Sequence, residues 1–272
     1  MISLKIPQIP ELEVEYYITD SHEKEHAKVY PPHIHNTIEI YILLEGNVSF
    51  IVEENMYKLT SGDAVLTKPN ELHNCILNAD TVHRHCCIHF APTCEFLLSS
   101  LLRHSFGKDN LISPSKEDKE ILITLPDKID HATANGDRLS AFTYILELIR
   151  IVSKNSPKAE STESSSLPAT LKCVLEQINS RYAEIVSVEE LCQENFVSHS
   201  TLCRLFKKHL RTTPSLYLET KRLAQSRILL RKGMSVTDAC TKCGFSDYSS
   251  FIRLFKKRFG ITPNAYKTVK RK

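Results

Sequence analysis

The 272-residue sequence has no tryptophan, no even set of cysteines and no apolar run long enough to span a membrane. Its amino terminus lacks a basic segment leading into an apolar one, which argues against a secretory leader. Nine scattered cysteines fit reduced thiols in a cytoplasm better than a disulfide framework. The absence of tryptophan removes a frequent stacking surface for sugars. We therefore expect a cytoplasmic protein without a membrane segment, with about two domains.

The net charge of +3 conceals an uneven distribution along the chain. From Ala169 to the end there are 20 Lys/Arg and 8 Asp/Glu, which gives a net charge of +12. The preceding residues hold 15 Lys/Arg and 24 Asp/Glu, which gives −9. Such asymmetry predicts that the C-terminal part binds a polyanion. Charge alone leaves open a solvated basic face with no partner.

The segment SKNSPKAESTESSSLP, residues 153–168, has almost no large apolar side chain. Because it cannot bury enough surface to offset chain entropy, we predict a flexible linker at residues 156–168. Upstream, short alternating apolar runs are broken by turn residues from about Val14 to Phe90. Several antiparallel strands at this spacing predict a small sandwich or barrel within residues 1–98.

Helical patterns follow over residues 99–155, and the first candidate helix is CEFLLSSLLRHSF, residues 94–106. The last helix of this region carries an apolar stripe with the i, i+3, i+4, i+7 spacing. A stripe of this kind either packs on the strands or pairs two subunits, and both possibilities stay open, with dimerisation assigned to this region. The stripe comprises Leu139, Phe142, Ile145, Leu146, Ile149 and Val152.

The C-terminal part repeats itself. RLFKKHLRTTPSLY, residues 204–217, aligns without a gap with RLFKKRFGITPNAY, residues 253–266. Together with the residues before it, each copy reads as helix, short turn and helix, with Ser198 and Asp247 placed to cap the second helix. The repeat predicts an all-α domain at residues 169–272 with two helix-turn-helix motifs. A plain helical bundle is the alternative.

An apolar face anchors the second helix of each motif and leaves a polar face to enter a major groove. Arginine can make two hydrogen bonds to a guanine edge, whereas the lysine pairs suit phosphates. Cys203 and Ile252 offer only weak or apolar contacts, for instance to a thymine methyl. The residues that this pattern predicts to bind double-stranded DNA are Ser200, Cys203, Arg204, Lys207, Lys208, Ser249, Ile252, Arg253, Lys256 and Lys257.

These repeats, and most specifically GFSDYSSFIRLFKKRFGITPNAYK at residues 244–267, resemble the DNA-binding domain of AraC/XylS-type transcription regulators. The resemblance implies transcription regulation and contact with RNA polymerase. It also implies that the reading positions are His199, Ser200, Cys203 and Arg204 in the first motif and Tyr248, Ser249, Ile252 and Arg253 in the second. Two positions depart from the family pattern. Arg211 stands where a glycine usually ends the first reading helix, and Phe196 replaces the small residue usual at the first turn.

The N-terminal run HIHNTIEIYILLEG, residues 33–46, resembles the first cupin motif, and GDAVLTKPNELHN, residues 62–74, resembles the second. The cupin fold is a small antiparallel β-barrel, which agrees with the strand pattern. In metal-binding cupins four matching positions bind one divalent ion, and three imidazoles with a carboxylate suit Zn, Ni, Fe or Mn. Alternatively, the same residues and Tyr41 line a pocket for an organic effector. The four positions are His33, His35, Glu39 and His73.

Two further patterns receive structural interpretations. His83, His85, Cys87 and His89 alternate on one strand face, where same-side neighbours lie ~6.5 Å or more apart, so we expect them to line a pocket or the core. Cys240 and the cysteine three residues later form a C-x-x-C inside the second motif, where small buried residues are expected.

The sequence thus predicts an α+β multidomain protein with a cupin-like antiparallel barrel, trailing helices and an all-α domain with two helix-turn-helix motifs. We expect a homodimeric, non-enzymatic transcription regulator whose DNA affinity or activity responds to a small-molecule effector in the barrel. A cupin metalloenzyme and a direct metal sensor, both using the His33, His35, Glu39 and His73 set, remain the alternatives.

Overall fold

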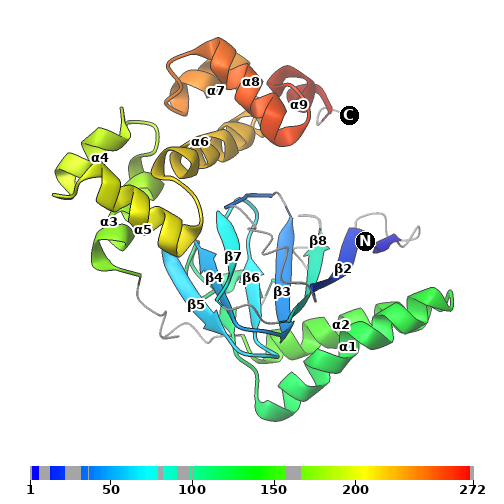
Figure 1. Cartoon of the computed structure of the whole chain (residues 1–272). Helices are drawn as coiled ribbons and strands as arrows, with labels where there is room; N and C mark the ends of the chain where they lie inside the picture. Colours follow the sequence, from blue (N-terminus) through cyan, green and yellow to red (C-terminus); the bar gives the residue numbers. More distant parts are fainter. Residues whose placement is uncertain are drawn as a thin grey trace. The chain divides into compact units, whose positions relative to one another are not determined.

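The computed structural model describes residues 2–5, 13–21, 32–35, 37–78, 82–90, 98–99, 101–156 and 167–269. By their contacts the residues form two compact units: the β-domain, residues 1–30 and 36–166, and the helical domain, residues 31–35 and 167–272 (Figure 1). None of the helices in the described ranges combines the length and the apolar character that a membrane span requires. Each unit is described by itself.

The β-domain contains two antiparallel sheets that share one interior. In spatial order the six-stranded sheet consists of β1 (Ile2–Lys5), β2 (Glu13–Ser21), β8 (His83–Phe90), β3 (Ile38–Glu45), β6 (Ala64–Thr67) and β9 (Leu111–Ile112). The three-stranded sheet consists of β5 (Asn55–Leu59), β4 (Val48–Val52) and β7 (His73–Leu77). The predicted antiparallel cupin-like fold is confirmed, in the form of two facing sheets rather than a closed barrel.

Strand β3 is buried on both faces, and its alternating sequence explains how. The aliphatic side chains of Ile38, Ile40 and Ile42 join a core on the outer side of the six-stranded sheet. Tyr41 and Leu43 instead join a second core between the two sheets. Because neighbouring side chains on a strand point to opposite faces, the aliphatic parity and the polar parity of this run are separated into different environments.

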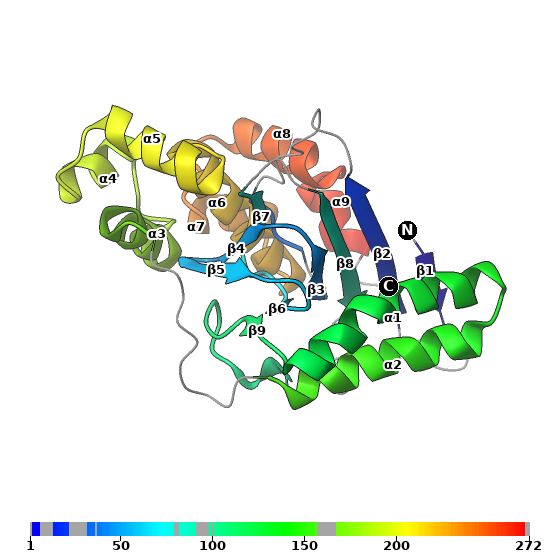
Figure 2. The same ribbon diagram turned by 60° about the horizontal axis from the view of Figure 1, so that its bottom comes forward.

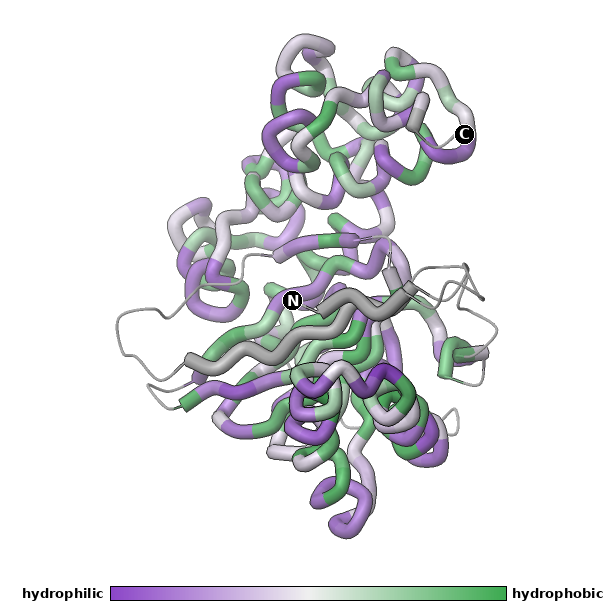
Figure 3. Tube along the Cα trace, turned by 90° about the vertical axis from the view of Figure 1, so that its right-hand side faces the viewer, coloured by the Kyte–Doolittle hydropathy of each residue, from purple (hydrophilic) through white to green (hydrophobic). Residues whose placement is uncertain are grey.

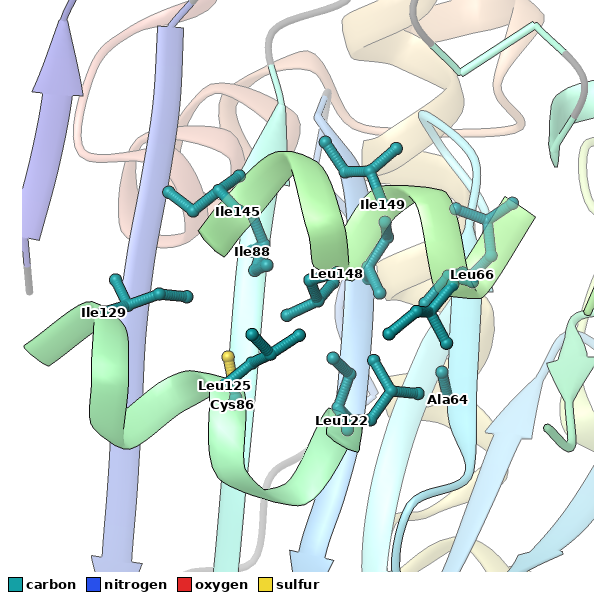
Figure 4. Close-up of a cluster of buried hydrophobic side chains, with 14 of the residues drawn as sticks. Ala64, Leu66, Cys86, Ile88, Leu122, Leu125, Ile129, Ile145, Leu148 and Ile149 are labelled. Atoms are coloured by element: carbon teal, nitrogen blue, oxygen red, sulfur yellow. The ribbon is translucent and has the colours of Figure 1, made fainter. Parts of the chain in front are cut away.

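The helices α1 (Lys116–Ala134) and α2 (Arg138–Lys154) form an antiparallel hairpin that covers the outer face of the six-stranded sheet (Figure 2). Figure 4 shows Leu125 of α1 and Leu148 of α2 directed at Cys86 and Ile88 of β8. Ser115 and Asp137 cap the two helices by accepting hydrogen bonds from backbone N–H groups three residues later. The hairpin therefore belongs to the same core as the sheet.

One expectation differs from this fold, and another cannot be compared with it. Residues 94–106 were expected to be helical, but within the described part only a 3-10 turn, η2 (Leu101–Arg103), occurs there. The core of the sheet is instead completed by Leu98 and Leu101. The expected linker at 156–168 lies almost wholly outside the described residues.

The helical domain consists of α3 to α9, and α6 lies between the pair α4–α5 and the pair α7–α8 (Figure 1). Along these helices, hydrophobic and hydrophilic segments alternate, as expected for helices with one apolar face (Figure 3). The helices are α3 (Ala169–Arg181), α4 (Val188–Glu194), α5 (His199–Leu210), α6 (Pro214–Arg231), α7 (Val236–Lys242), α8 (Tyr248–Phe259) and α9 (Pro263–Val269).

Candidate DNA-binding surface and effector site

The first helix-turn-helix motif is formed by α4 and α5. The hydroxyl of Ser198 accepts a hydrogen bond from the N–H of Thr201 and so fixes the start of α5. Leu202, Phe206 and Leu210 are fully buried and recur at every fourth position, so they anchor one face of the helix. The opposite face is left to solvent.

The second motif, α7 and α8, repeats this construction. Asp247 accepts hydrogen bonds from the N–H groups of Ser249 and Ser250, and its pKa is lowered chiefly by the bond to Ser250. Phe251 and Phe255 are fully buried and pack against α6 and α7. Both second helices are 12 residues long. Equivalent residues of α5 and α8 therefore have the same orientation relative to the buried face of their helix.

The predicted DNA-binding residues occupy the outward faces of α5 and α8. Two of them, Cys203 and Ile252, are half-buried. The sulfur of Cys203 lies 3.8 Å from Nδ1 of His199, one helical turn earlier. The exposed members are His199, Ser200, Arg204, Lys207, Lys208, Tyr248, Ser249, Arg253, Lys256 and Lys257.

The two departures from the family pattern fall at the places where the backbone turns left-handed. Phe196 has φ of 53° and Arg211 also has φ of 53°, whereas the second motif has Gly244 and Gly260 at the corresponding positions, with φ of 79° and 77°. A side chain in this conformation costs roughly 1–2 kcal/mol. Phe196 is also 96% exposed, so no packing offsets that cost.

Not all the positive charge of the helical domain faces solvent. Lys221 is 2% exposed and Arg227 is 8% exposed, although both were counted in the net charge of this part. The guanidinium of Arg227 lies 4.9 Å from the ring centre of Phe259, and burial lowers its pKa. Arg222 donates from Nε to the carbonyl oxygen of Tyr182 at 2.8 Å. These α6 residues therefore stabilise the fold. The net charge counted from the sequence did not distinguish them from residues that could contact DNA.

In the β-domain, Glu39 is 4% exposed and lies among three polar side chains. Its Oε2 is 3.5 Å from Nε2 of His73 and 3.7 Å from Nε2 of His89, and the Cys87 thiol donates to its Oε1 at 3.7 Å. Burial by itself lowers the pKa of His73, but hydrogen bonding and the charge of Glu39 raise it above the ordinary value. Glu39 therefore increases the proton affinity of the His73 imidazole.

Tyr41 occupies the next inward position of β3 and organises a second polar group. Its hydroxyl lies 2.9 Å from Nε2 of His83, and its ring stacks on His85 at 4.9 Å between centres. Burial raises the pKa of Tyr41 well above its usual value. Burial also lowers the pKa of His83 to about 4 and that of His85 to about 3. Both histidines are therefore neutral at pH 7, as expected for residues that line the interior.

The predicted metal ligands divide between the two units. Glu39 and His73 lie together in the β-domain, 3.5 Å apart between Oε2 and Nε2. His33 and His35, whose ring centres are 5.9 Å apart, belong to the segment 31–35, which clusters with the helical domain. Three imidazoles and one carboxylate are donors that suit a divalent ion.

His89 was assigned only to a pocket or core, yet it contacts the central carboxylate of this cluster. Its Cα pairs with that of Glu39 across β3 and β8, and its Nδ1 lies 3.0 Å from the hydroxyl of Thr37. The sequence signal for this contact was the alternation of the β8 histidines, which places them on one side of the strand. Which of them faces Glu39 depends on the strand register.

The C-x-x-C pair of the second motif is buried as expected. Cys243 is fully buried and Cys240 is 3% exposed. Burial raises the pKa of Cys243 to about 12, so its thiol is protonated and unreactive at neutral pH.

Comparison with protein families gives two matches that together cover both units. Residues 16–149 match the model described as an AraC-like ligand binding domain, and residues 191–268 match a helix-turn-helix domain. The first match covers the strands from β2 onward and most of the α1–α2 hairpin. The second begins within α4 and covers the rest of both motifs.

Similar proteins include named regulators. An uncharacterized HTH-type transcriptional regulator, YbfI of Bacillus subtilis (strain 168), is 27% identical over 80% of each chain. The HTH-type transcriptional activator RhaS of Klebsiella pneumoniae (strain 342) is 24% identical, again over 80% of each chain. Among solved structures, ToxT from Vibrio cholerae O395 is 14% identical, covers 94% of this chain and 97% of its own, and gives a TM-score of 0.38.

Proposed function

The chain belongs to the AraC family of transcription regulators, and on that premise we propose that an effector bound in its β-domain changes how its two helix-turn-helix motifs bind promoter DNA. The protein is thus a DNA-binding regulator with a ligand-binding domain. We propose that it acts in the cytoplasm, where it meets the chromosome, and that it catalyses no reaction. Relatives that are named transcription activators support the regulatory role.

One observation carries the DNA-binding proposal. Two equally long helices, α5 and α8, are each anchored by buried phenylalanine and each expose an arginine and a lysine pair at equivalent positions. Exposed cations on a helix that projects from a packed motif fit the phosphates and base edges of a major groove. A single basic helix face could belong to a solvated surface with no partner. The same basic face on two equivalent helices is better explained by a shared role in binding DNA.

The salt dependence of DNA binding tests this proposal. Replacing Lys207 and Lys256 together by alanine should weaken binding across all sequences and reduce the salt slope by about 2, because each lysine releases about one counterion. Lys128→Ala on α1 is the matched control and should leave the slope unchanged. An unchanged slope in the double variant would count against phosphate contact by these helices.

The effector proposal rests on the polar cluster inside the β-domain. Glu39, Tyr41, His73 and His89 are buried or nearly buried polar groups surrounded by the apolar interior of the two sheets. A few polar groups in an apolar setting are typical of sites that orient a small ligand. The ligand can act only if it binds unequally to the DNA-competent and DNA-incompetent arrangements.

We divide the tasks along the chain as follows. Residues 1–98 bind the effector, residues 99–155 pair two subunits, residues 156–168 connect, and residues 169–272 bind DNA. Leu139, which is 78% exposed, and Leu146, which is 40% exposed, support the pairing role because they lie on the outward side of α2. Contact with RNA polymerase completes the proposed mode of action and follows from the family alone.

A direct metal sensor is the second candidate, because two of the four predicted ligands, Glu39 and His73, lie 3.5 Å apart between Oε2 and Nε2. The resemblance to metal-binding cupins adds His33 and His35 to this pair. A bound divalent ion would supply a positive charge beside Glu39. Metal analysis of the purified chain, followed by DNA-binding measurements with and without chelator, tests it. A metal-dependent DNA affinity that His73→Ala abolishes would favour the sensor. Substrate turnover that depends on the ion would instead favour a cupin enzyme.

A further inference from the structure

We infer that the operator of this regulator carries guanine at matching positions of two half-sites one helical turn of DNA apart, with a thymine beside it in only one of them. The inference rests on the proposed function and specifies its DNA partner. It follows from which side chains α5 and α8 share and which they do not.

The two reading helices can be compared position by position. Both contain 12 residues, both begin directly after a side-chain cap, and both bury a phenylalanine at the same place, Phe206 in α5 and Phe255 in α8. Equivalent side chains therefore leave each helix in the same direction relative to its anchored face. A residue shared by the two helices reads the same feature of each half-site.

Arg204 and Arg253 are the shared candidates for base contact. They occupy equivalent positions, two residues before the anchoring phenylalanine, and both are exposed. Neither guanidinium forms a salt bridge within the described part of the chain, since the ion pairs there involve other residues. Arginine with a free planar end makes two hydrogen bonds to O6 and N7 of guanine, the most common specific contact in a major groove. Two such arginines predict two guanines.

The neighbouring position differs between the motifs. Ile252 is half-buried and packs partly against the core of the second motif, which fixes its branched side chain. Its equivalent, Cys203, is directed at His199, with the sulfur 3.9 Å from Nε2. A fixed aliphatic group favours the thymine methyl, whereas the thiol offers only a weak contact. The thymine preference is therefore confined to the half-site that α8 reads.

The length of α6 sets the spacing between half-sites. Its 18 residues span about 27 Å, and α6 lies between the two motifs. Successive major grooves on one side of DNA are ~34 Å apart, which corresponds to about 10–10.5 base pairs. Because α6 lies between the two motifs, we infer that α5 and α8 read two successive grooves of one duplex.

Selection from a random duplex pool with the full chain tests the inference. We expect enriched sequences with two guanines about 10–11 base pairs apart and a thymine within about two base pairs of one of them. Arg204→Ala should relax guanine at the half-site without thymine, and Arg253→Ala should relax guanine at the other. Each change should lower discrimination about 5- to 150-fold at its own position.

Exchanging the two residues that differ between the motifs, Ile252 and Cys203, tests the thymine preference directly. Ile252→Cys should remove the thymine preference, and Cys203→Ile should create one in the opposite half-site. The circular dichroism spectrum of each variant shows whether the helices are intact, and Lys207→Ala shows the uniform loss expected of a phosphate contact. Arginine variants that weaken all sequences equally, or a thymine that is unmoved by both exchanges, would overturn the inference. Binding without any enriched sequence would overturn the proposed sequence-specific regulator as well.

Discussion

Two histidines of the β-domain are buried in surroundings that keep them neutral. His83 and His85 are 1% and 4% exposed and stack on each other at 4.6 Å between ring centres. Tyr41, which contacts both, is equally buried. Neutral imidazoles can be accommodated there because their hydrogen bonds and stacking do not require a proton. His73 is the opposite case, because its hydrogen bond to Glu39 and the charge of Glu39 raise its pKa.

The neutral pair predicts that the β-domain loses stability in mild acid. The unfolded histidines have a pKa near 6.5, whereas the folded values are about 4 for His83 and about 3 for His85. Below pH 6.5 the unfolded chain therefore binds more protons, and the free energy of unfolding falls by up to about 1.4 kcal/mol per pH unit for each histidine. Thermal unfolding between pH 7 and pH 5, followed by the tyrosine near-UV signal, measures this.

The variant His85→Gln removes one of the two titrating groups, so its pH dependence should be shallower. A pH dependence that the variant leaves untouched would mean that other groups cause the acid sensitivity.

Gly244 provides a prediction from local geometry. Its φ is +79°, and an added Cβ would lie 2.4 Å from the carbonyl oxygen of Ala183. Gly233 also has positive φ, +92°, but no atom lies within 4 Å of its added Cβ. Gly233→Ala should therefore cost about 1–2 kcal/mol and Gly244→Ala distinctly more, because the backbone must also move. Chemical denaturation of the two variants compares them directly, and equal losses would contradict the close approach at Ala183.

At the scale of elements, the two motifs are built alike but differ in how they end. The second motif has glycine at both left-handed positions, whereas the first has Phe196 and Arg211. The N–H of Gly260 also donates to the carbonyl of Lys256, which completes the end of α8. The first motif therefore reaches the same geometry at a higher conformational cost.

Replacing Phe196 and Arg211 by glycine should stabilise the first motif. Each change removes a left-handed penalty of roughly 1–2 kcal/mol and adds the chain entropy of glycine, about 0.5–1 kcal/mol, so a net gain of about 0.5–1 kcal/mol per site is expected. Hydrogen exchange along α4 and α5 measures the gain. Gly260→Arg in the second motif is the reverse control and should accelerate exchange in α8. Faster exchange in the glycine variants would show that the side chains make stabilising contacts.

The hairpin of α1 and α2 shows how an element serves two surfaces. Of the apolar stripe expected on the last helix, Ile145, Ile149 and Val152 are buried against the sheet. Leu139 and Leu146 remain exposed on the outward side. The apolar stripe is therefore wider than the part that the sheet covers. Its buried side packs on the strands, and its exposed side leaves apolar surface for a second subunit.

At the scale of the whole molecule, we predict that this outward surface pairs two chains. Replacing Leu139 and Leu146 by aspartate should shift a dimer toward monomer, because it places charges in an apolar contact. Val186→Asp, at an 89% exposed apolar position of the helical domain, is the matched control and should leave the mass unchanged. Light scattering after gel filtration gives the mass. A wild-type chain that is monomeric at all concentrations would exclude dimerisation through α2.

Modularity is the second prediction at this scale. Residues 167–272 include their own apolar core, centred on Leu223, Phe251 and Phe255, so this fragment should fold and bind DNA without the β-domain. Its affinity should be lower than that of the full chain if dimerisation supplies effective concentration. Circular dichroism and DNA titration test it, with Arg253→Ala in the fragment as control. A folded fragment indifferent to DNA would contradict the assignment of DNA binding to this unit.

Much of the molecule was determined by short-range patterns in the sequence. The alternating apolar runs between Val14 and Phe90 predicted antiparallel strands, and the repeat of arginine, lysine and phenylalanine predicted two equivalent motifs. Both succeed because period and local capping are properties of neighbouring residues, which the chain states directly. In the described part of residues 94–106 the predicted helix was wrong, because a local pattern does not contain contacts with distant residues. The apolar period of this segment could not show that Leu98 and Leu101 each pack into the core of the sheet.

Only the tertiary structure decided what depends on residues distant in sequence. The register between β3 and β8 brings His89, rather than another histidine of its strand, to Glu39. The packing of α6 buries Lys221 and Arg227, which a charge count assigns to the DNA surface. Strand register and helix packing are fixed by the sum of many contacts across the core, and no local pattern contains that sum.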